Sequence, residues 1–325
     1  MGISLIDPSG NALGLALGLR ALGHDVRITI GLGDRFREEL VEQVLGGRTV
    51  MPDPRAELLV VVDNFADIRW ALENDRQLDA PMDPDDPLGP TINPLIYPLR
   101  LRRYLDLAAG AQRVVWIDTS DRQAPRERML AAVPGVQLAR EVPVVGADPE
   151  WQPFPFLYHP NVLWMEHLRA RGLWSVTAVS RPRLLDWVFC GLVDDGRYQG
   201  RRRALLQDVI ARWPAVRGVV PPLGPFRDVL RWLQCSRLML DLPGCGEICF
   251  RLHEALALGV PILRPWPWTV AMADGLEAVR VTDPTQATVP DHDQVLEIYE
   301  RCYAPRAAAR CVLAALQPVP AHACP

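Results

Sequence analysis

Short apolar runs alternate with segments of helical composition along the whole chain of 325 residues. This alternation constrains the fold more than any other feature of the sequence. In the first half, helices are expected over 11–22 and 97–109, and four runs are expected to be strands: 3–6, 26–30, 57–65 and 113–121. Because strands that alternate with helices build parallel sheets covered by helices, the first half predicts a Rossmann-like α/β domain.

The second half repeats the pattern after a helix expected over 163–171. Strands are expected over 186–193, 216–220, 236–244, 260–265 and 277–283, and helices over 201–213, 225–234, 249–259, 291–301 and 305–316. The chain length suits two domains of about 150 residues each. The sequence therefore predicts two doubly wound domains facing a cleft.

The expected domain limits follow from these segments. Residues 1–170 form the first domain and 171–302 the second, and 303–325 form a C-terminal helix and tail that packs back on the first domain. The Asp- and Pro-rich residues 76–96 predict a long loop or lid, and the proline-rich residues 142–161 an irregular crossing segment. Gly14 and Gly18 in the first helix predict a close approach to the sheet.

Composition excludes several classes of chemistry. The chain contains no lysine, so a Walker-type phosphate loop, a Schiff base and pyridoxal chemistry are excluded. The formal net charge of −4 lacks the positive charge of a general nucleic-acid binder, so DNA is a possible but not a favoured partner.

Cysteine usage and hydropathy bear on the compartment. None of the seven cysteines has C-x-x-C spacing, and we expect reduced thiols and no metal site. The N-terminus lacks the basic region of a signal peptide, and no apolar run reaches about 18 residues. We therefore expect a cytoplasmic protein with no membrane span.

The segment DLPGCGEICFRLHEALALGVPILRP (241–265) carries the strongest functional signal. Gly244 and Gly246 let the backbone come close to a ligand. The helix that follows offers free N–H groups and a partial positive charge to an anion such as a diphosphate, and Arg251 lies in its first turn. The alternative is an ordinary strand–helix turn with a surface pair of Glu and Arg.

This segment resembles the donor-binding segment of GT-B glycosyltransferases, most closely the exostosin-like and other family-1-type members. They share a strand, a Gly-containing loop and the pattern R-x-x-EAL-x-x-G-x-P. The resemblance implies that the loop binds the nucleotide diphosphate, that Arg251 contacts phosphate and that Glu254 holds the ribose. Retaining members often place seven residues between two Glu, whereas six separate Glu247 and Glu254 here, which leaves the role of Glu247 and the stereochemistry open.

Two further segments resemble parts of the same superfamily. VFCGLVDDGRYQGRRRALL resembles the opening of the donor domain, where a basic residue reaches the diphosphate. That makes Arg197, Arg201 and Arg203 candidates, with a solvated helix face as the alternative. WIDTSD followed by LAREVPV resembles an acidic strand end and an F-K-R-E segment of the interdomain region in some bacterial glycosyltransferases, which assigns no role to its residues.

An inverting enzyme needs a base at the cleft, and carboxylates that end predicted strands are candidates. Asp118 and Asp63 are the first choices, with Asp121, His24 and Asp7 behind them. The alternative for each aspartate is to cap the turn that follows its strand. Trp266 and Trp268 could stack on a base or a sugar, or pack between the domains.

The sequence thus predicts a metal-independent glycosyltransferase that uses a nucleotide-diphosphate sugar as donor substrate and no cofactor. The acceptor is left open between a polysaccharide, a natural product and a modified nucleic-acid base. Two alternatives share the fold: a non-catalytic sugar-nucleotide-binding protein and a sugar-nucleotide epimerase. Both would also bind the donor.

Overall fold

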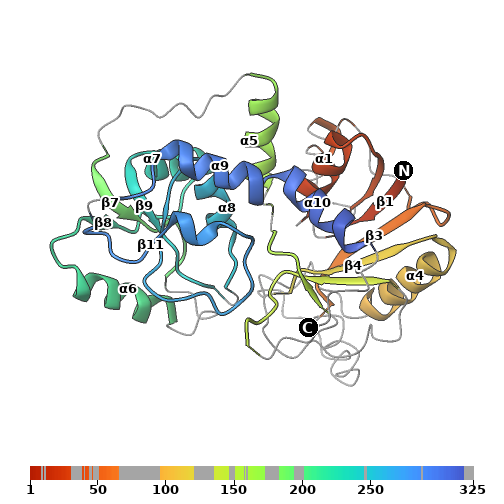
Figure 1. Ribbon diagram of the computed structural model, residues 1–325, viewed down its shortest axis with the longest axis horizontal. Helices are drawn as coiled ribbons and strands as arrows, with labels where there is room; N and C mark the ends of the chain where they lie inside the picture. The colour runs from red at the N-terminus through yellow and green to blue at the C-terminus, as the bar shows by residue number, and fades with distance from the viewer. Residues whose placement is uncertain are drawn as a thin grey trace.

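The structure is a computed structural model with two parallel β-sheets (Figure 1). It describes residues 1–8, 10, 12–30, 39, 41–43, 46, 51–65, 96–120, 135–145, 151–156, 158, 160–172, 183–193, 201–244, 247–286 and 288–317. The first sheet has the order β2-β1-β3-β4-β5-β6, and the second has the order β11-β10-β9-β7-β8. Every pair of neighbouring strands is parallel, which confirms the predicted α/β class with two Rossmann-like units.

The strands are short. The first sheet contains β1 (Gly2–Ile6), β2 (Asp25–Thr29), β3 (Leu58–Asp63), β4 (Val114–Asp118), β5 (Val136–Ala139) and β6 (Gln152–Pro153). The second contains β7 (Leu185–Val188), β8 (Gly218–Val219), β9 (Ser236–Leu240), β10 (Ile262–Leu263) and β11 (Arg280–Val281).

In both sheets the order of the strands reverses next to the strand that comes first in the chain, β1 or β7. The chain places β2 on one side of β1 and all later strands on the other, and it does the same with β8 around β7. Such a reversal is a topological switch point, and open α/β sheets bind ligands there, at the carboxyl ends of the strands. The fold therefore singles out the carboxyl ends of β1 and β3 and those of β7 and β9.

Helices cover both faces of each sheet because the central strands are apolar on both sides. In β3, Val60 belongs to the core that contains α1 (Leu13–Ala21), whereas Val61 belongs to the core that contains Tyr104 of α4 (Ile96–Gly110). In the second sheet, α6 (Arg201–Arg212) covers one face. The other face carries α7 (Phe226–Gln234), α8 (Phe250–Ala257) and α9 (His292–Cys302).

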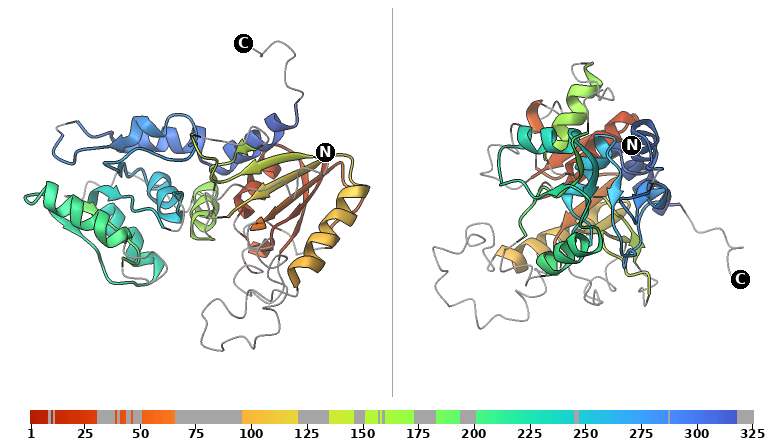
Figure 2. Two further views of the ribbon diagram at one scale, coloured as in Figure 1. Left: turned by 90° about the horizontal axis from the view of Figure 1, so that it is seen from below. Right: turned by 90° about the vertical axis from the view of Figure 1, so that its left-hand side faces the viewer.

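Two helices join the halves of the molecule. α5 (Pro160–Ala170) contacts both α1 and α8, and α10 (Pro305–Ala315) packs along α1, as the blue and red helices of Figure 1 show. Figure 2 shows α9 and α10 running from one sheet toward the other. The limits 170 and 302 coincide with the ends of α5 and α9, and the division into domains at these residues stays a prediction.

The expected approach of the first helix to the sheet is wrong for its two glycines. A Cβ on Gly18 would lie 1.9 Å from the carbonyl oxygen of Pro305, and one on Gly14 would lie 2.5 Å from the ring of Tyr158. The glycines therefore admit α10 and an aromatic ring rather than the sheet. The sequence could not show this because α10 is almost 300 residues away along the chain.

Some elements differ from the expectation. β5 and β6 were not predicted, and β6 lies in the proline-rich crossing segment. In the predicted strand 277–283, residues Leu276–Val279 form a 3-10 helix instead, and only Arg280–Val281 pair. Most of the predicted lid at 76–96 lies outside the described residues. Among the described helices, none combines the length and apolar character needed to cross a bilayer.

Candidate functional site

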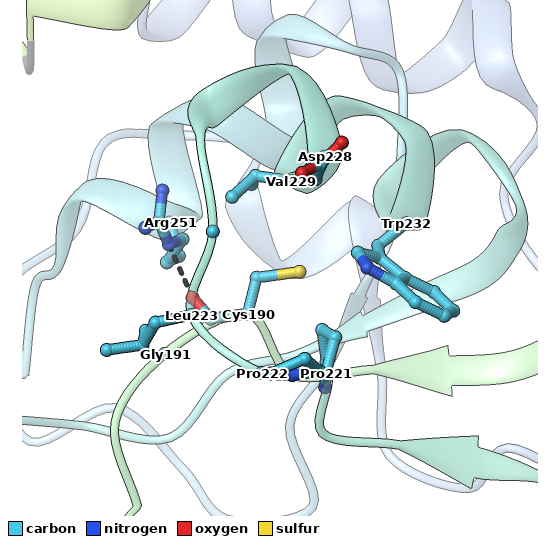
Figure 3. A pocket seen from close by; sticks show the side chains of 10 residues that line it. Cys190, Gly191, Pro221, Pro222, Leu223, Asp228, Val229, Trp232 and Arg251 are labelled. Carbon is cyan, nitrogen blue, oxygen red and sulfur yellow. Dashed lines mark hydrogen bonds between the residues drawn. The ribbon is translucent and has the colours of Figure 1, made fainter.

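A recess opens at the switch point of the second sheet (Figure 3). Its walls come from the segments after β7 and β8 and from the starts of α7 and α8, and they include Cys190, Pro222, Leu223, Asp228, Trp232 and Arg251. About 310 Å³ of unfilled space lies within it, counted out to the surrounding solvent.

Arg251, in the first turn of α8, joins the recess to the helix. Its Nε–H donates to the carbonyl oxygen of Cys190, the dashed line in Figure 3, and its Nη1 donates to the carboxylate of Glu254. Burial alone would lower the pKa of Arg251, but the adjacent carboxylate of Glu254 outweighs it and the pKa is raised. The side chain is 27% exposed and is among those that line the recess.

Glu254 is fully buried behind Arg251. Burial raises the pKa of this carboxyl, while Arg251 acts in the opposite direction. Asn161 of α5 donates to Glu254 Oε1 at 3.4 Å. The structure thus brings two predicted donor contacts, Arg251 and Glu254, together as an ion pair, and the role of Glu254 as a ribose contact stays a prediction.

Glu247 belongs to a second group of buried charges. The Arg264 guanidinium donates to Asp241 Oδ2 from Nη1 at 2.7 Å and to Glu247 from Nη2. Arg264 is 0% exposed, and Asp241 and Glu247 are each 1% exposed. Burial raises the pKa of Asp241 more than Arg264 lowers it. Because Asp241 precedes the glycine loop and Glu247 follows it, one guanidinium ties both ends of that loop.

The two tryptophans contact this guanidinium. Its central carbon lies 3.8 Å from the ring centroid of Trp268 and 5.7 Å from that of Trp266, which are cation–π distances. Their predicted stacking on a ligand stays a prediction, since here both rings face Arg264. Arg264 was not predicted as a site residue, although a charged residue directly after the apolar run VPIL was a usable signal.

The basic residues before and within α6 divide into separate roles. Arg201 is 48% exposed and donates to Glu247 Oε1 at 2.9 Å, which joins it to the buried charges. Arg202, which was not predicted, is buried and donates to the carbonyl oxygens of Leu192 and Pro243. Gly244 lies half-buried in the loop after β9. Arg197 and Gly246 lie outside the described residues.

The predicted bases lie at the carboxyl edge of the first sheet. Asp63 and Asp118 are register partners on β3 and β4, and both are buried. Asp63 accepts hydrogen bonds from the hydroxyl of Tyr104 at 2.8 Å and from the N–H of Asn64 at 2.8 Å. Asp118 Oδ1 accepts from the N–H groups of Ser120 and Phe65.

These bonds are those of carboxylates that cap the turn after a strand. A catalytic role for Asp63 and Asp118 stays a prediction that the contacts do not favour. Asp7 makes the same kind of bond, accepting from the N–H of Ala12 at 2.7 Å. His24 precedes β2 and so lies at the opposite edge of the sheet, and Asp121 lies outside the described residues.

No group of three or more His, Cys, Asp or Glu side chains within the described part of the chain is arranged to hold a metal ion. Cys190, Cys235, Cys249, Cys302 and Cys311 are free thiols in the structure.

No family model and no curated protein matches this chain. Solved structures with a related arrangement include the UDP-N-acetylglucosamine 2-epimerase of Rickettsia bellii, with a TM-score of 0.40, 9% identity and coverage of 97% of this chain and 95% of that one. The UDP-GlcNAc 2-epimerase of Neisseria meningitidis, bound to UDP-GlcNAc, has a TM-score of 0.42 and 10% identity, with coverage of 97% of this chain and 98% of that one. An α-glucosyltransferase in complex with UDP and a 13-mer DNA has a TM-score of 0.37 and 9% identity, with coverage of 97% of this chain and 95% of that one. At these values the similarity carries no argument about activity.

Proposed function

We propose that this protein binds a nucleotide-diphosphate sugar at the carboxyl edge of its second sheet and transfers the sugar to an acceptor held by its first domain. The observation that carries the proposal is the position of Arg251. Its charged side chain lines a recess at the switch point of a doubly wound sheet and stands in the first turn of α8. The GT-B-like sequence pattern around Arg251 and Glu254 supports the same assignment.

The chemistry needs stabilisation of negative charge. When the bond between sugar and diphosphate breaks, the diphosphate leaves with extra charge, and preorganised donors lower that barrier most effectively. Arg251 uses its Nε–H and one Nη1–H for Cys190 and Glu254, and its side chain, which is 27% exposed, lines the recess. The N–H groups at the start of α8 add a partial positive charge.

The recess suits the nucleoside part of the donor. Pro222, Leu223 and Trp232 supply apolar faces, and the chain at 221–224 supplies backbone groups that can read the edge of a base. A base bound in the recess would place the attached diphosphate beside Arg251, because Arg251 also lines the recess.

A second candidate is a protein that binds the sugar nucleotide without transferring it to an acceptor. It is favoured by one observation: both predicted bases, Asp63 and Asp118, are engaged in local hydrogen bonds. Turnover separates the candidates, because donor hydrolysis in the absence of an acceptor requires an enzyme.

The test is a thermal-shift screen of the full chain with uridine, guanosine, thymidine, adenosine and cytidine diphosphates and their sugar conjugates. A ligand at 100 times its dissociation constant should stabilise the wild type by about 2.7 kcal/mol. We expect one nucleotide to stabilise the wild type but not Arg251→Ala. Arg212→Ala is the matched control, since Arg212 also pairs with a carboxylate of its own helix but lies at the far end of α6. Stabilisation by none of the nucleotides would refute the proposal.

A further inference from the structure

The segment LAREVPV, to which the sequence assigned no role, lies against the donor-side loops. It leaves β5 at the carboxyl edge of the first sheet, where the N–H of Arg140 donates to the carbonyl oxygen of Asp118 at 2.9 Å. Glu141 then reaches the second half of the molecule: its Oε1 accepts a hydrogen bond from the N–H of Ile248 at 2.9 Å. Ile248 lies between Glu247 and the start of α8.

The contact is buried and charged. Glu141 is 0% exposed, and its Oε1 lies 3.9 Å from Nη2 of Arg140, which is also buried. A buried N–H that loses its acceptor costs free energy, and a bond to an ionised acceptor is stronger than one between neutral groups. Glu141 is therefore a costly residue to place here unless the loop needs it.

Main-chain pairing fixes the same segment on its other side. The N–H of Ala271 donates to the carbonyl oxygen of Val142 at 2.7 Å, and the N–H of Val144 donates to that of Thr269 at 3.0 Å. Pro143 and Val270 form an antiparallel bridge. Residues 269–271 follow the tryptophans that face Arg264, so the first domain holds the chain on both sides of that buried guanidinium.

Glu141 does not occupy the anion-binding end of the helix itself. The N-cap of α8 is Cys249 and its first residue is Phe250, so Ile248 precedes the cap. The N–H of Ile248 that donates to Glu141 therefore lies outside the first turn of α8. What Glu141 fixes is the path by which the chain enters α8, three residues before Arg251.

We infer that Glu141 is a positioning residue through which the first domain holds residues 247–249, which lead into α8, and with them Arg251, in the geometry that binds the donor diphosphate. The diphosphate in this inference rests on the proposed function, whereas the contact between Glu141 and Ile248 does not. Donor affinity then depends on a residue of the acceptor domain that touches no part of the donor.

The experiment compares two variants of the full chain, Glu141→Gln and Glu141→Met. Both remove the charge beside Arg140 and have similar length, but only Gln keeps an oxygen that can accept from Ile248. Glu166→Met is the matched control, because Glu166 is a largely buried carboxylate that accepts a hydrogen bond from Tyr299 on α9, away from the loop. Should the Met variant not fold, Glu141→Asp, one methylene shorter, replaces it.

Two readouts separate this inference from the proposed function. Hydrogen exchange of the peptide covering 247–252 should be about tenfold faster in Glu141→Met than in the wild type, and within about threefold of the wild type in Glu141→Gln. The dissociation constant of the nucleoside diphosphate that the wild type binds should follow the same order, rising about tenfold in Glu141→Met. Glu166→Met should change neither quantity.

Unchanged exchange in Glu141→Met would overturn the inference, and so would tighter binding of the diphosphate, which would make Glu141 a competitor of the ligand. If the wild type binds no nucleotide, the proposed function fails, whereas the exchange data still decide whether Glu141 holds the loop.

Discussion

Both sheets carry buried carboxylates at the carboxyl ends of their strands, but the partners of these carboxylates differ between the two sheets. In the first sheet, Asp63 and Asp118 accept hydrogen bonds from a hydroxyl and from backbone N–H groups. In the second sheet, Asp241 and Glu247 share the guanidinium of Arg264, and Glu254 pairs with Arg251.

The difference decides which edge suits an anionic ligand. The hydroxyl and N–H groups that donate to Asp63 and Asp118 are neutral. At the second edge, guanidinium groups pair with the buried carboxylates. Two of these cations, Arg251 and Arg201, are partly exposed, by 27% and 48% of their side chains. A diphosphate is therefore expected at the second edge.

The largest effect is expected from removing the cation that the second edge depends on. Arg264→Met leaves Asp241 buried without its guanidinium partner and leaves Glu247 with only the half-exposed Arg201. It should lower the free energy of unfolding by about 3–5 kcal/mol, measured by urea denaturation. Arg301→Ala, which breaks a pair with both side chains more than half exposed, should change it by less than about 1 kcal/mol. Equal losses in the two variants would mean that the buried network contributes nothing specific.

The next effect is a pH dependence that belongs to α8. Burial lowers the pKa of His253 to about 4, and its ring packs between Tyr158 and Tyr303. The unfolded chain therefore binds a proton first as the pH falls, and stability is lost between about pH 6.5 and pH 4. At pH 5 the loss due to His253 should be about 2 kcal/mol relative to pH 7.

His253→Phe should remove this part of the pH dependence while keeping an aromatic ring between the two tyrosines. The measurement is the free energy of unfolding of both proteins at pH 7, 6 and 5. Parallel lines for wild type and variant would show that His253 is not held neutral by the fold.

A smaller effect is expected at the first edge. Tyr104→Phe removes the hydroxyl that donates to Asp63 and should lower the free energy of unfolding by about 1–2 kcal/mol. Because this contact is confined to the first sheet, binding of a nucleoside diphosphate at the second edge should not change. A weaker affinity in Tyr104→Phe would show that the two edges are coupled, contrary to the comparison.

The smallest effect on stability is expected for Arg201→Ala. Its side chain is 48% exposed, so its pair with Glu247 should contribute less than about 1 kcal/mol. If Arg201 also contacts the diphosphate, affinity should nevertheless fall about tenfold, as for the loss of one charged hydrogen bond. Calorimetric titration of wild type and variant at one salt concentration measures this, and unchanged affinity would leave Arg201 as a partner of Glu247 only.

Several predicted elements with long patterns were confirmed. β3 and β4 were expected because each is an unbroken apolar run that ends in Asp, and α6 and α10 were expected because residues of helical type continue for three turns. β5, β6 and the 3-10 helix at Leu276–Val279 were missed, whereas the two-residue strands β8 and β10 were expected, so length alone does not explain the misses. Short elements depend on the neighbours that they pair with.

The candidate site was predicted in part for the same reason. The glycine loop and Arg251 follow from a local pattern, and the structure places Arg251 at a recess. Arg264, Asn161 and Glu141 could not be assigned, since their partners lie 17, 93 and 107 residues away in the chain.

The sequence alone establishes the α/β class, the order of most strands and helices, and the position of the glycine loop before α8. These are local properties, set by the alternation of apolar and polar residues and by glycine itself. The partner of each buried charge was established only by folding: Arg264 for Asp241 and Glu247, Arg251 for Glu254, and Glu141 for the N–H of Ile248. A charge inside a protein is stable only beside its counterpart, and which residues become neighbours depends on how two sheets pack rather than on spacing along the chain.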